Sequence, residues 1–222
     1  MIFLLITSNS VRGDNRLIMK RFCLLMWAIA GCCGVWGQSG PEVLRAVSEK
    51  MATMESYRIE FALEMEAAEN PSKGHCVVAG ERYMIAIDDL VQGCDGEVLW
   101  MVNGAVGEVT LDSPKPHSRS LFDNPTRAFD FAEEMFEVVD FDDSEAGVWK
   151  LVLRPAVGVL DGIEHVVLHV ERATSLPVRL GYDMGGMGLY LNIASVAPTE
   201  VTGEEFVFAP ANYPDCEIID FR

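Results

Sequence analysis

The chain has 222 residues, of which 17 are lysine or arginine and 34 are aspartate or glutamate, giving a formal net charge of −17 at pH 7. This acidity argues against nucleic acid as a partner, because binding to a polyanion needs clustered basic side chains and no such cluster follows Arg21. Half of the residues, 50%, are hydrophobic, and the length is sufficient for one domain that buries its own core.

The N-terminus has the pattern of an exported protein. We expect residues 1–18 to be an upstream extension, because a start at Met19 is followed by two basic residues and an apolar run. That run is too short for a retained membrane-spanning helix, so it predicts a signal peptide over residues 19–37. The mature protein would begin at Gln38 and form a single domain over residues 38–222.

A second processing signal lies within this apolar run. Ile29-Ala30-Gly31-Cys32 resembles the lipobox of bacterial lipoproteins, in which the cysteine becomes the acylated N-terminus. Cleavage there would tether the protein to a membrane through Cys32. Alternatively, Cys32 is simply a small apolar residue of the signal peptide.

Three of the six cysteines fall in the mature chain, at Cys76, Cys94 and Cys216. A disulfide between Cys76 and Cys94 is a candidate if their strands are adjacent, because disulfide geometry limits the distance between the two Cα atoms. The sequence has no zinc pattern of closely paired ligands. We therefore predict neither a metal nor a cofactor.

Hydrophobic periodicity predicts one helix followed by many strands. Ser39-Gly40-Pro41 precedes apolar residues at helical spacing from Val43 to Met54, which predicts an amphipathic helix. From Tyr57 the period changes to two, which is typical of a strand with one buried face. Further strands are predicted at residues 75–79, 82–87, 97–102, 106–111, 136–141, 148–153, 164–171, 177–183, 188–195 and 205–208.

The short turns between these strands favour antiparallel neighbours, because a parallel crossover needs a dozen residues or more. Residues 120–135 interrupt the pattern and predict one or two short helices, broken at Asn124-Pro125. The predicted fold is mainly β (α+β): a strongly curved antiparallel sheet, or incomplete β-barrel, with an N-terminal helix and a short helical lid.

No catalytic motif accompanies this fold. The sequence lacks the patterns of serine or cysteine nucleophiles and of phosphate-binding loops. His165 and His169, four residues apart, would share one face of a strand, where they cannot hold a metal without a third ligand. An exposed polar face explains them better, and we predict that the chain is not an enzyme.

Large apolar side chains are unusually frequent for a domain of this size. Core packing accounts for most of them, and the functional alternative is a cavity for a flexible apolar ligand. The candidate cavity residues are Phe61, Leu63, Met65, Met84, Trp100, Phe122, Phe129, Phe131 and Met135.

Three motifs in this order resemble the periplasmic outer-membrane lipoprotein carriers, the LolA-like family. They are the strand entry Asp95-Gly96-Glu97-Val98-Leu99-Trp100, the strand from Trp149 to Pro155, and the ending from Phe206 to Arg222. The resemblance implies a monomeric periplasmic chaperone that holds the acyl chains of lipoproteins in an apolar cavity. It also implies two partners: an inner-membrane ATP-driven transporter that releases lipoproteins, and an outer-membrane acceptor.

The sequence departs from the family pattern at one point. Better-known members have an Arg-Pro pair after the second strand, whose arginine latches the helices over the barrel, whereas this chain has Ala79-Gly80-Glu81-Arg82. Arg82 is expected to point to the other face of the sheet. Two other interpretations remain open: a lipid-binding or lipoprotein-binding module tethered through Cys32, and a structural domain without a ligand.

Overall fold

The computed structural model describes residues 38–222 apart from 67, 121 and 133. These residues belong to the second of two compact units into which the chain divides. The predicted extension, the signal peptide and the lipidation at Cys32 lie outside the described residues. No helix in the described part is both long and apolar enough to cross a membrane.

The predicted N-terminal helix is α2 (Gly40–Ala52). It is preceded by Ser39, whose backbone N–H and hydroxyl both donate to Oε2 of Glu42, at 2.8 and 2.9 Å. Pro41 occupies the first turn, where its missing N–H costs nothing. The apolar stripe of the helix is buried and consists of Val43, Leu44, Val47 and Met51.

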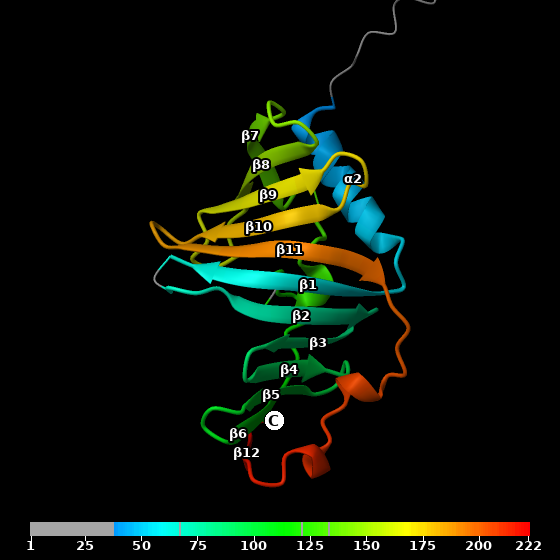
Figure 1. The fold of residues 1–222 in the computed structure, drawn as a ribbon, viewed down its shortest axis with the longest axis vertical. Coiled ribbons are helices and arrows are strands. Elements are labelled where there is room, and N and C mark those ends of the chain that lie inside the picture. The colour runs from blue at the N-terminus through cyan, green and yellow to red at the C-terminus, as the bar shows by residue number, and fades with distance from the viewer. Residues whose placement is uncertain (1–37, 67, 121, 133) are drawn as a thin grey trace, which may run out of the picture. The chain divides into compact units, whose positions relative to one another are not determined.

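Twelve strands form one sheet (Figure 1). They are β1 (Ser56–Met65), β2 (Ser72–Ala79), β3 (Arg82–Ile87), β4 (Leu90–Cys94), β5 (Leu99–Asn103), β6 (Glu108–Asp112), β7 (Phe136–Asp142), β8 (Val148–Pro155), β9 (His165–Glu171), β10 (Pro177–Asp183), β11 (Gly188–Pro198) and β12 (Glu217–Asp220). Their order across the sheet is β12-β6-β5-β4-β3-β2-β1-β11-β10-β9-β8-β7. Every neighbouring pair is antiparallel except β12 and β6, which are parallel.

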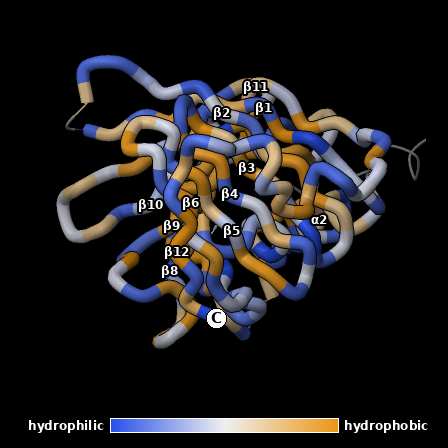
Figure 2. Tube along the Cα trace, turned by 90° about the horizontal axis from the view of Figure 1, so that it is seen from below, coloured by the Kyte–Doolittle hydropathy of each residue, from blue (hydrophilic) through white to orange (hydrophobic). Residues whose placement is uncertain are grey.

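The alternation of side chains gives this sheet two faces. We call the one that packs against α2 the helix face, and the other the opposite face. On β1, Ile59 and Phe61 are buried in one core with the apolar stripe of α2, whereas Arg58 and Glu60 lie on the opposite face. Figure 2 shows that the strongly hydrophobic stretches of the chain lie mostly on strands.

The sheet is open, with β12 and β7 at its two ends and no pairing between them among the described residues. The register shifts on β1 between Glu60 and Phe61, and on β7 between Val138 and Asp140. Such irregularities bend strands and increase their twist. The predicted fold class, a mainly β protein with a curved antiparallel sheet and an N-terminal helix, is confirmed.

Strand β4 was not predicted. It contains Gly93, and a glycine inside a strand weakens the sequence pattern. In the structure, a Cβ at Gly93 would overlap the indole of Trp100 on β5. The glycine is therefore part of the strand and allows the indole to lie against its backbone.

The predicted strand at 205–208 is wrong, and the short strand β12 was missed. Residues 199–216, which we call the C-terminal cover, contain two 3-10 turns, η2 (Glu204–Phe206) and η3 (Pro210–Asn212). In Figure 1 this segment leads from the end of β11 to β12. Its Phe206 is fully buried and packs with residues of β2. Phe206 is thus buried because it packs onto the sheet, and not because it belongs to a strand.

Residues 113–135, which we call the strap, connect β6 to β7. One or two short helices were predicted at 120–135, but the described residues contain a single 3-10 turn, η1 (Pro125–Arg127). The helical lid is therefore corrected to a mostly irregular strap. Its main-chain groups bond to side chains of the sheet and of α2 in place of the bonds that a helix would make.

Candidate apolar binding site

The strap is held on the helix face by polar contacts to its backbone. The hydroxyl of Tyr83 donates to the carbonyl oxygen of Asp123 at 2.8 Å, and Nε2 of Gln92 donates to the carbonyl oxygen of Phe122 at 2.8 Å. Gln92 also donates to the Tyr83 hydroxyl at 3.2 Å, and burial raises the pKa of that tyrosine. Tyr83 and Gln92 therefore present fixed hydrogen-bonding groups to the strap.

A separate contact joins the strap to α2. The backbone N–H of Phe131 donates to Oγ of Ser48, which lies within α2, at 3.0 Å. The aromatic rings of Phe129 and Phe131 are 4% and 5% exposed and belong to the helix-face core. The strap is thus anchored to the helix by one side-chain hydrogen bond and by two buried aromatic rings.

The strap is also braced within itself. The guanidinium of Arg119, whose side chain is only 9% exposed, lies 2.9 Å from the carboxylate of Asp130. Arg127 approaches the same carboxylate at 3.8 Å. Removing Asp130 would leave the nearly buried charge of Arg119 without this partner, which would destabilise the strap.

Two openings lie along α2 where it meets the strap. The larger has a volume of about 320 Å³, at the C-terminal half of the helix. Its lining combines methionine, aromatic and small residues with two carboxylates: Ser48, Met51, Ala52, Met54, Glu55, Tyr57, Val78, Gly80, Thr126, Phe129 and Asp130. Burial raises the pKa of Tyr57 above its ordinary value, which itself already keeps the hydroxyl neutral at physiological pH. The opening presents no fixed positive charge.

The smaller opening has a volume of about 260 Å³, near the N-terminal half of the helix. It is lined by Pro41, Leu44, Arg45, Phe131, Phe136, Glu137 and Val138. The hydrogen bond between Ser48 and Phe131 lies between the two openings, since Ser48 lines the larger and Phe131 the smaller. Both are lined in part by residues of the core that α2, the strap and the sheet share.

The structure divides the nine candidate cavity residues into three groups. Phe129 lines the larger opening and Phe131 the smaller. Four others belong to the helix-face core or pack against it: Phe61, Leu63, Phe122 and Met135. The remaining three are elsewhere, because Met65 is 48% exposed and Met84 and Trp100 lie on the opposite face.

The placement of Trp100 corrects its assignment to the cavity. Its Nε1 donates to the carbonyl oxygen of Phe206 at 2.7 Å, and its ring centroid lies 6.0 Å from that of Phe208. Met84 packs with the same group of residues. These side chains fill the space beneath the C-terminal cover, so they cannot line an opening beside α2.

Sequence analysis missed several residues that do line the openings. Met51 lies in the last turn of α2 and Met54 just after the helix, and Leu44 comes from its first half. Their apolar spacing was recognised, but only as the buried stripe of a helix. The signal that could have identified them is the pair of methionines at the helix end, because flexible thioether side chains suit an adaptable apolar site.

Cys76 and Cys94 do not form the candidate disulfide. They lie on β2 and β4, with β3 between them, so the condition of adjacent strands is not met. Both thiols are free and buried, and burial raises the pKa of each. They behave as small core side chains.

Arg82 lies on the opposite face, as expected from its register. Its guanidinium carbon is 5.2 Å from the centroid of the Phe206 ring, in the C-terminal cover. It is therefore separated by the sheet from α2 and the strap. In this chain, the hydrogen bond between helix and strap is made by Ser48 and Phe131.

No family model and no curated protein matches this sequence. Solved structures do match its fold. A crystal structure of an uncharacterized conserved protein from Thermus thermophilus has a TM-score of 0.54 and 12% sequence identity, covering 82% of this chain and 99% of that one. This likeness shows a shared fold.

Two further matches are named for the family that the sequence resembles. A LolA superfamily protein from Nitrosomonas europaea has a TM-score of 0.43 and 12% identity, and covers 78% of this chain and 99% of its own. A putative outer membrane lipoprotein-sorting protein domain from Vibrio parahaemolyticus has a TM-score of 0.42 and 12% identity, with 73% and 95% covered. The solved structures similar to this chain thus include a member of the LolA superfamily.

Proposed function

We propose that this chain is a periplasmic carrier that binds the acyl chains of lipoproteins between α2 and the strap and conveys them toward the outer membrane. The observation that carries the proposal is the pair of openings along α2, both lined in part by residues of one apolar core. The sequence resemblance to LolA-like carriers supports it independently. The proposed role is binding and not catalysis.

The physical need for such a carrier follows from the hydrophobic effect. Exposing each methylene group to water costs about 0.8 kcal/mol, so a lipoprotein with two or three acyl chains cannot cross an aqueous compartment alone. The larger opening, at about 320 Å³, is at the lower end of the range for ligand sites. Movement of the strap away from α2 would enlarge it.

The contact between Ser48 and Phe131 is suited to such movement. One hydrogen bond between neutral groups contributes about 1 kcal/mol, which is small enough to be exchanged for contacts with a ligand. Parting of these two residues would join the two openings into one groove along the helix. The ligand would then shift the population toward the parted state.

A carrier also needs a donor and an acceptor. By resemblance, these are an inner-membrane ATP-driven transporter and an outer-membrane acceptor, and the mature carrier would be a diffusible monomer that begins at Gln38. The lipobox-like Ile29-Ala30-Gly31-Cys32 favours a second candidate, a tethered module that binds lipid or lipoprotein. The two candidates differ in the mass of the mature protein, because the carrier would begin at Gln38 and the tethered module at an acylated Cys32.

The test uses a fluorescent diacylated lipopeptide and a variant that fills the larger opening. Ala52 is exposed at the end of α2 and lines that opening, so Ala52→Trp places an indole in its mouth without disturbing the core. We expect the variant to bind the lipopeptide at least tenfold more weakly than the wild type in a fluorescence anisotropy titration.

The matched control is Lys50→Trp, an exposed position on the same helix that lines neither opening. It should bind as the wild type does, and the same peptide without acyl chains should not bind. Equal affinity of Ala52→Trp and Lys50→Trp would show that the acyl chains bind elsewhere, and would contradict the proposal.

A further inference from the structure

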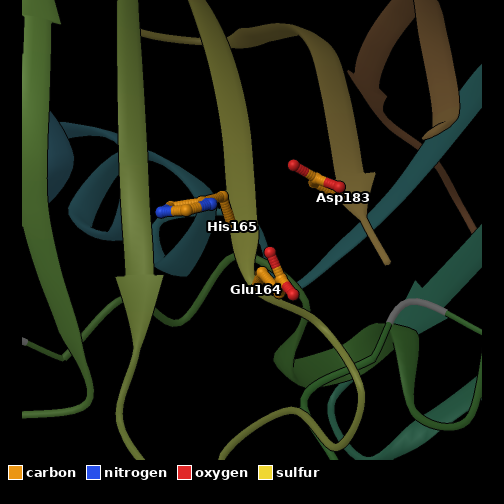
Figure 3. A group of neighbouring side chains, drawn as sticks. All are labelled: Glu164, His165 and Asp183. Atoms are coloured by element: carbon orange, nitrogen blue, oxygen red, sulfur yellow. The ribbon is translucent and has the colours of Figure 1, made fainter. Parts of the chain in front are cut away.

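Three metal-ligating side chains lie near one another on the opposite face, at the start of β9 and the end of β10 (Figure 3). Glu164, His165 and Asp183 each offer one ligand atom, and these atoms all lie within 4.8 Å of one another. We propose that they form a binding site for a divalent transition-metal ion, of which Zn²⁺ is the representative. The site lies on the other side of the sheet from the openings along α2.

Strand pairing creates this arrangement. Asp183 pairs directly with His165, and their neighbours Tyr182 and Val166 are buried in the helix-face core. Since side chains alternate, His165 and Asp183 both point to the opposite face. Glu164 precedes β9, so it is free of that alternation, and its backbone N–H donates to the carbonyl oxygen of Asp183 at 2.8 Å.

The turn between β10 and β11 shapes the site further. The backbone N–H of Gly186 donates to Oδ1 of Asp183 at 3.3 Å, which orients the carboxylate in the way that outer groups orient metal ligands. A Cβ at Gly185 would lie 3.4 Å from Oε1 of Glu164, so the turn approaches that carboxylate closely. With φ of 72° and 99°, these two glycines adopt backbone conformations that other residues rarely tolerate.

The charges around the site favour a cation. The carboxylates of Glu164 and Asp183 form no ion pair with a lysine or arginine among the described residues. Arg154, on the neighbouring β8, pairs with Glu137 at 2.7 Å, and Arg179, on β10, lies 3.7 Å from Glu64. Two neighbouring carboxylates without a positive partner repel each other, and a bound divalent ion would relieve that repulsion.

The donor set selects the class of metal. Carboxylate oxygen atoms alone would suit Mg²⁺ or Ca²⁺, whereas an imidazole nitrogen favours zinc and its transition-metal neighbours. Tetrahedral zinc with bonds of about 2.1 Å holds its ligands about 3.4 Å apart, so the three atoms, which lie within 4.8 Å of one another, need to close by at most about 1.4 Å. Side-chain rotation suffices, because His165 and Asp183 are half-buried and Glu164 is exposed. Three protein ligands leave one coordination position for water.

The sequence analysis did not identify the site because it considered His165 as a metal ligand only together with His169. His169 lies on the same face of β9 but pairs with Arg179 and Lys150, while the partners of His165 come from the preceding loop and from β10. The contact between residues 165 and 183 depends on the register of two strands, and the sequence does not show that register. The expectation that no metal binds is replaced by this proposal.

The test is calorimetric titration of the full chain with ZnCl₂ after removal of metals by chelation, comparing the wild type with His165→Gln and Asp183→Asn. We expect one Zn²⁺ per chain, with affinity at least tenfold lower in each variant, and no displacement by an equal concentration of Mg²⁺. The matched control is His169→Gln, which should bind as the wild type does. Circular dichroism would check that each variant is folded.

Nuclear magnetic resonance provides a second readout that does not depend on the variants. Zinc should shift the ring signals of His165 and leave those of His169 in place. Absence of saturable binding by the wild type would overturn the proposal. So would undiminished binding in His165→Gln, or a loss in His169→Gln equal to that in His165→Gln.

Discussion

Gly93 makes room on the opposite face for one large side chain. Its neighbour across the strand pair is Trp100, whose indole lies against the Gly93 backbone and donates to the carbonyl oxygen of Phe206. Because that hydrogen bond fixes the ring, it cannot move away from an added methyl group. We expect Gly93→Ala to reduce the free energy of unfolding by about 1–3 kcal/mol, as measured by urea denaturation.

A double-mutant cycle separates this overlap from a general effect of losing glycine. In a Trp100→Leu background the indole is absent, so Gly93→Ala should cost much less than in the wild type. If the cost is the same in both backgrounds, the indole is not the reason for the glycine.

The face on which each large residue lies could be predicted only in part. Alternation correctly grouped Ile59, Phe61 and Leu63 of β1 on one side. On β2, however, Val77 and Val78 are both buried, on opposite sides of the sheet. Where both faces are apolar, a period of two does not say which face is which. Trp100 and Met84 were assigned to the cavity for this reason.

At the scale of single elements, the capping of α2 makes a testable contribution to pH dependence. Hydrogen bonds from Ser39, first from its backbone and then from its hydroxyl, hold the pKa of Glu42 below its ordinary value. A carboxylate whose pKa is lowered by folding stabilises the protein above the pKa of the unfolded chain. That contribution is lost as the pH falls through the lower pKa of the folded state.

We therefore expect Glu42→Gln to be less stable than the wild type at about pH 6, with a difference that shrinks toward about pH 3.5. Urea midpoints at the two pH values measure this. Glu49→Gln removes the same charge from the same helix outside the capping interaction, and serves as the control. A difference between wild type and Glu42→Gln that stays constant with pH would contradict the assignment.

Elements with a clear local signal were predicted well, and those defined by distant contacts were not. The helix over residues 40–52 has both a cap and an apolar stripe in its sequence. Residues 205–208 were predicted as a strand, yet they belong to the C-terminal cover: the Phe208 ring packs near Trp100, and the carbonyl oxygen of Phe206 accepts a hydrogen bond from the indole. Residues 120–135 of the strap were predicted to form one or two short helices, but the strap backbone bonds to Tyr83, Gln92 and Ser48.

At the scale of the described domain, one open sheet supports two different covers. The helix face lies beneath α2 and the strap, and the C-terminal cover packs on the opposite face at β2–β6. Only the first of these covers is bordered by the two openings described above. Binding of an acyl chain should therefore require movement of the strap against α2, while the C-terminal cover stays in place.

The sequence predicted the fold class and the order of most elements, because turns and periodicity are local properties. The openings could not be predicted in the same way. They depend on the path of the strap across the sheet, which is set by contacts such as that between Ser48 and Phe131, 83 residues apart. Met51, Met54 and the aromatic residues of the strap were all visible in the sequence, but the contact between these two segments was not.

The measurement that tests the central claim most directly is native mass spectrometry of the protein purified from periplasm after co-expression with an acylated lipoprotein. We expect a one-to-one complex, which is lost when the acylated cysteine of the cargo is replaced. We also expect the intact mass of the carrier to be that of a chain beginning at Gln38. A protein without any lipid or lipoprotein adduct, carrying an acylated Cys32, would contradict the diffusible carrier.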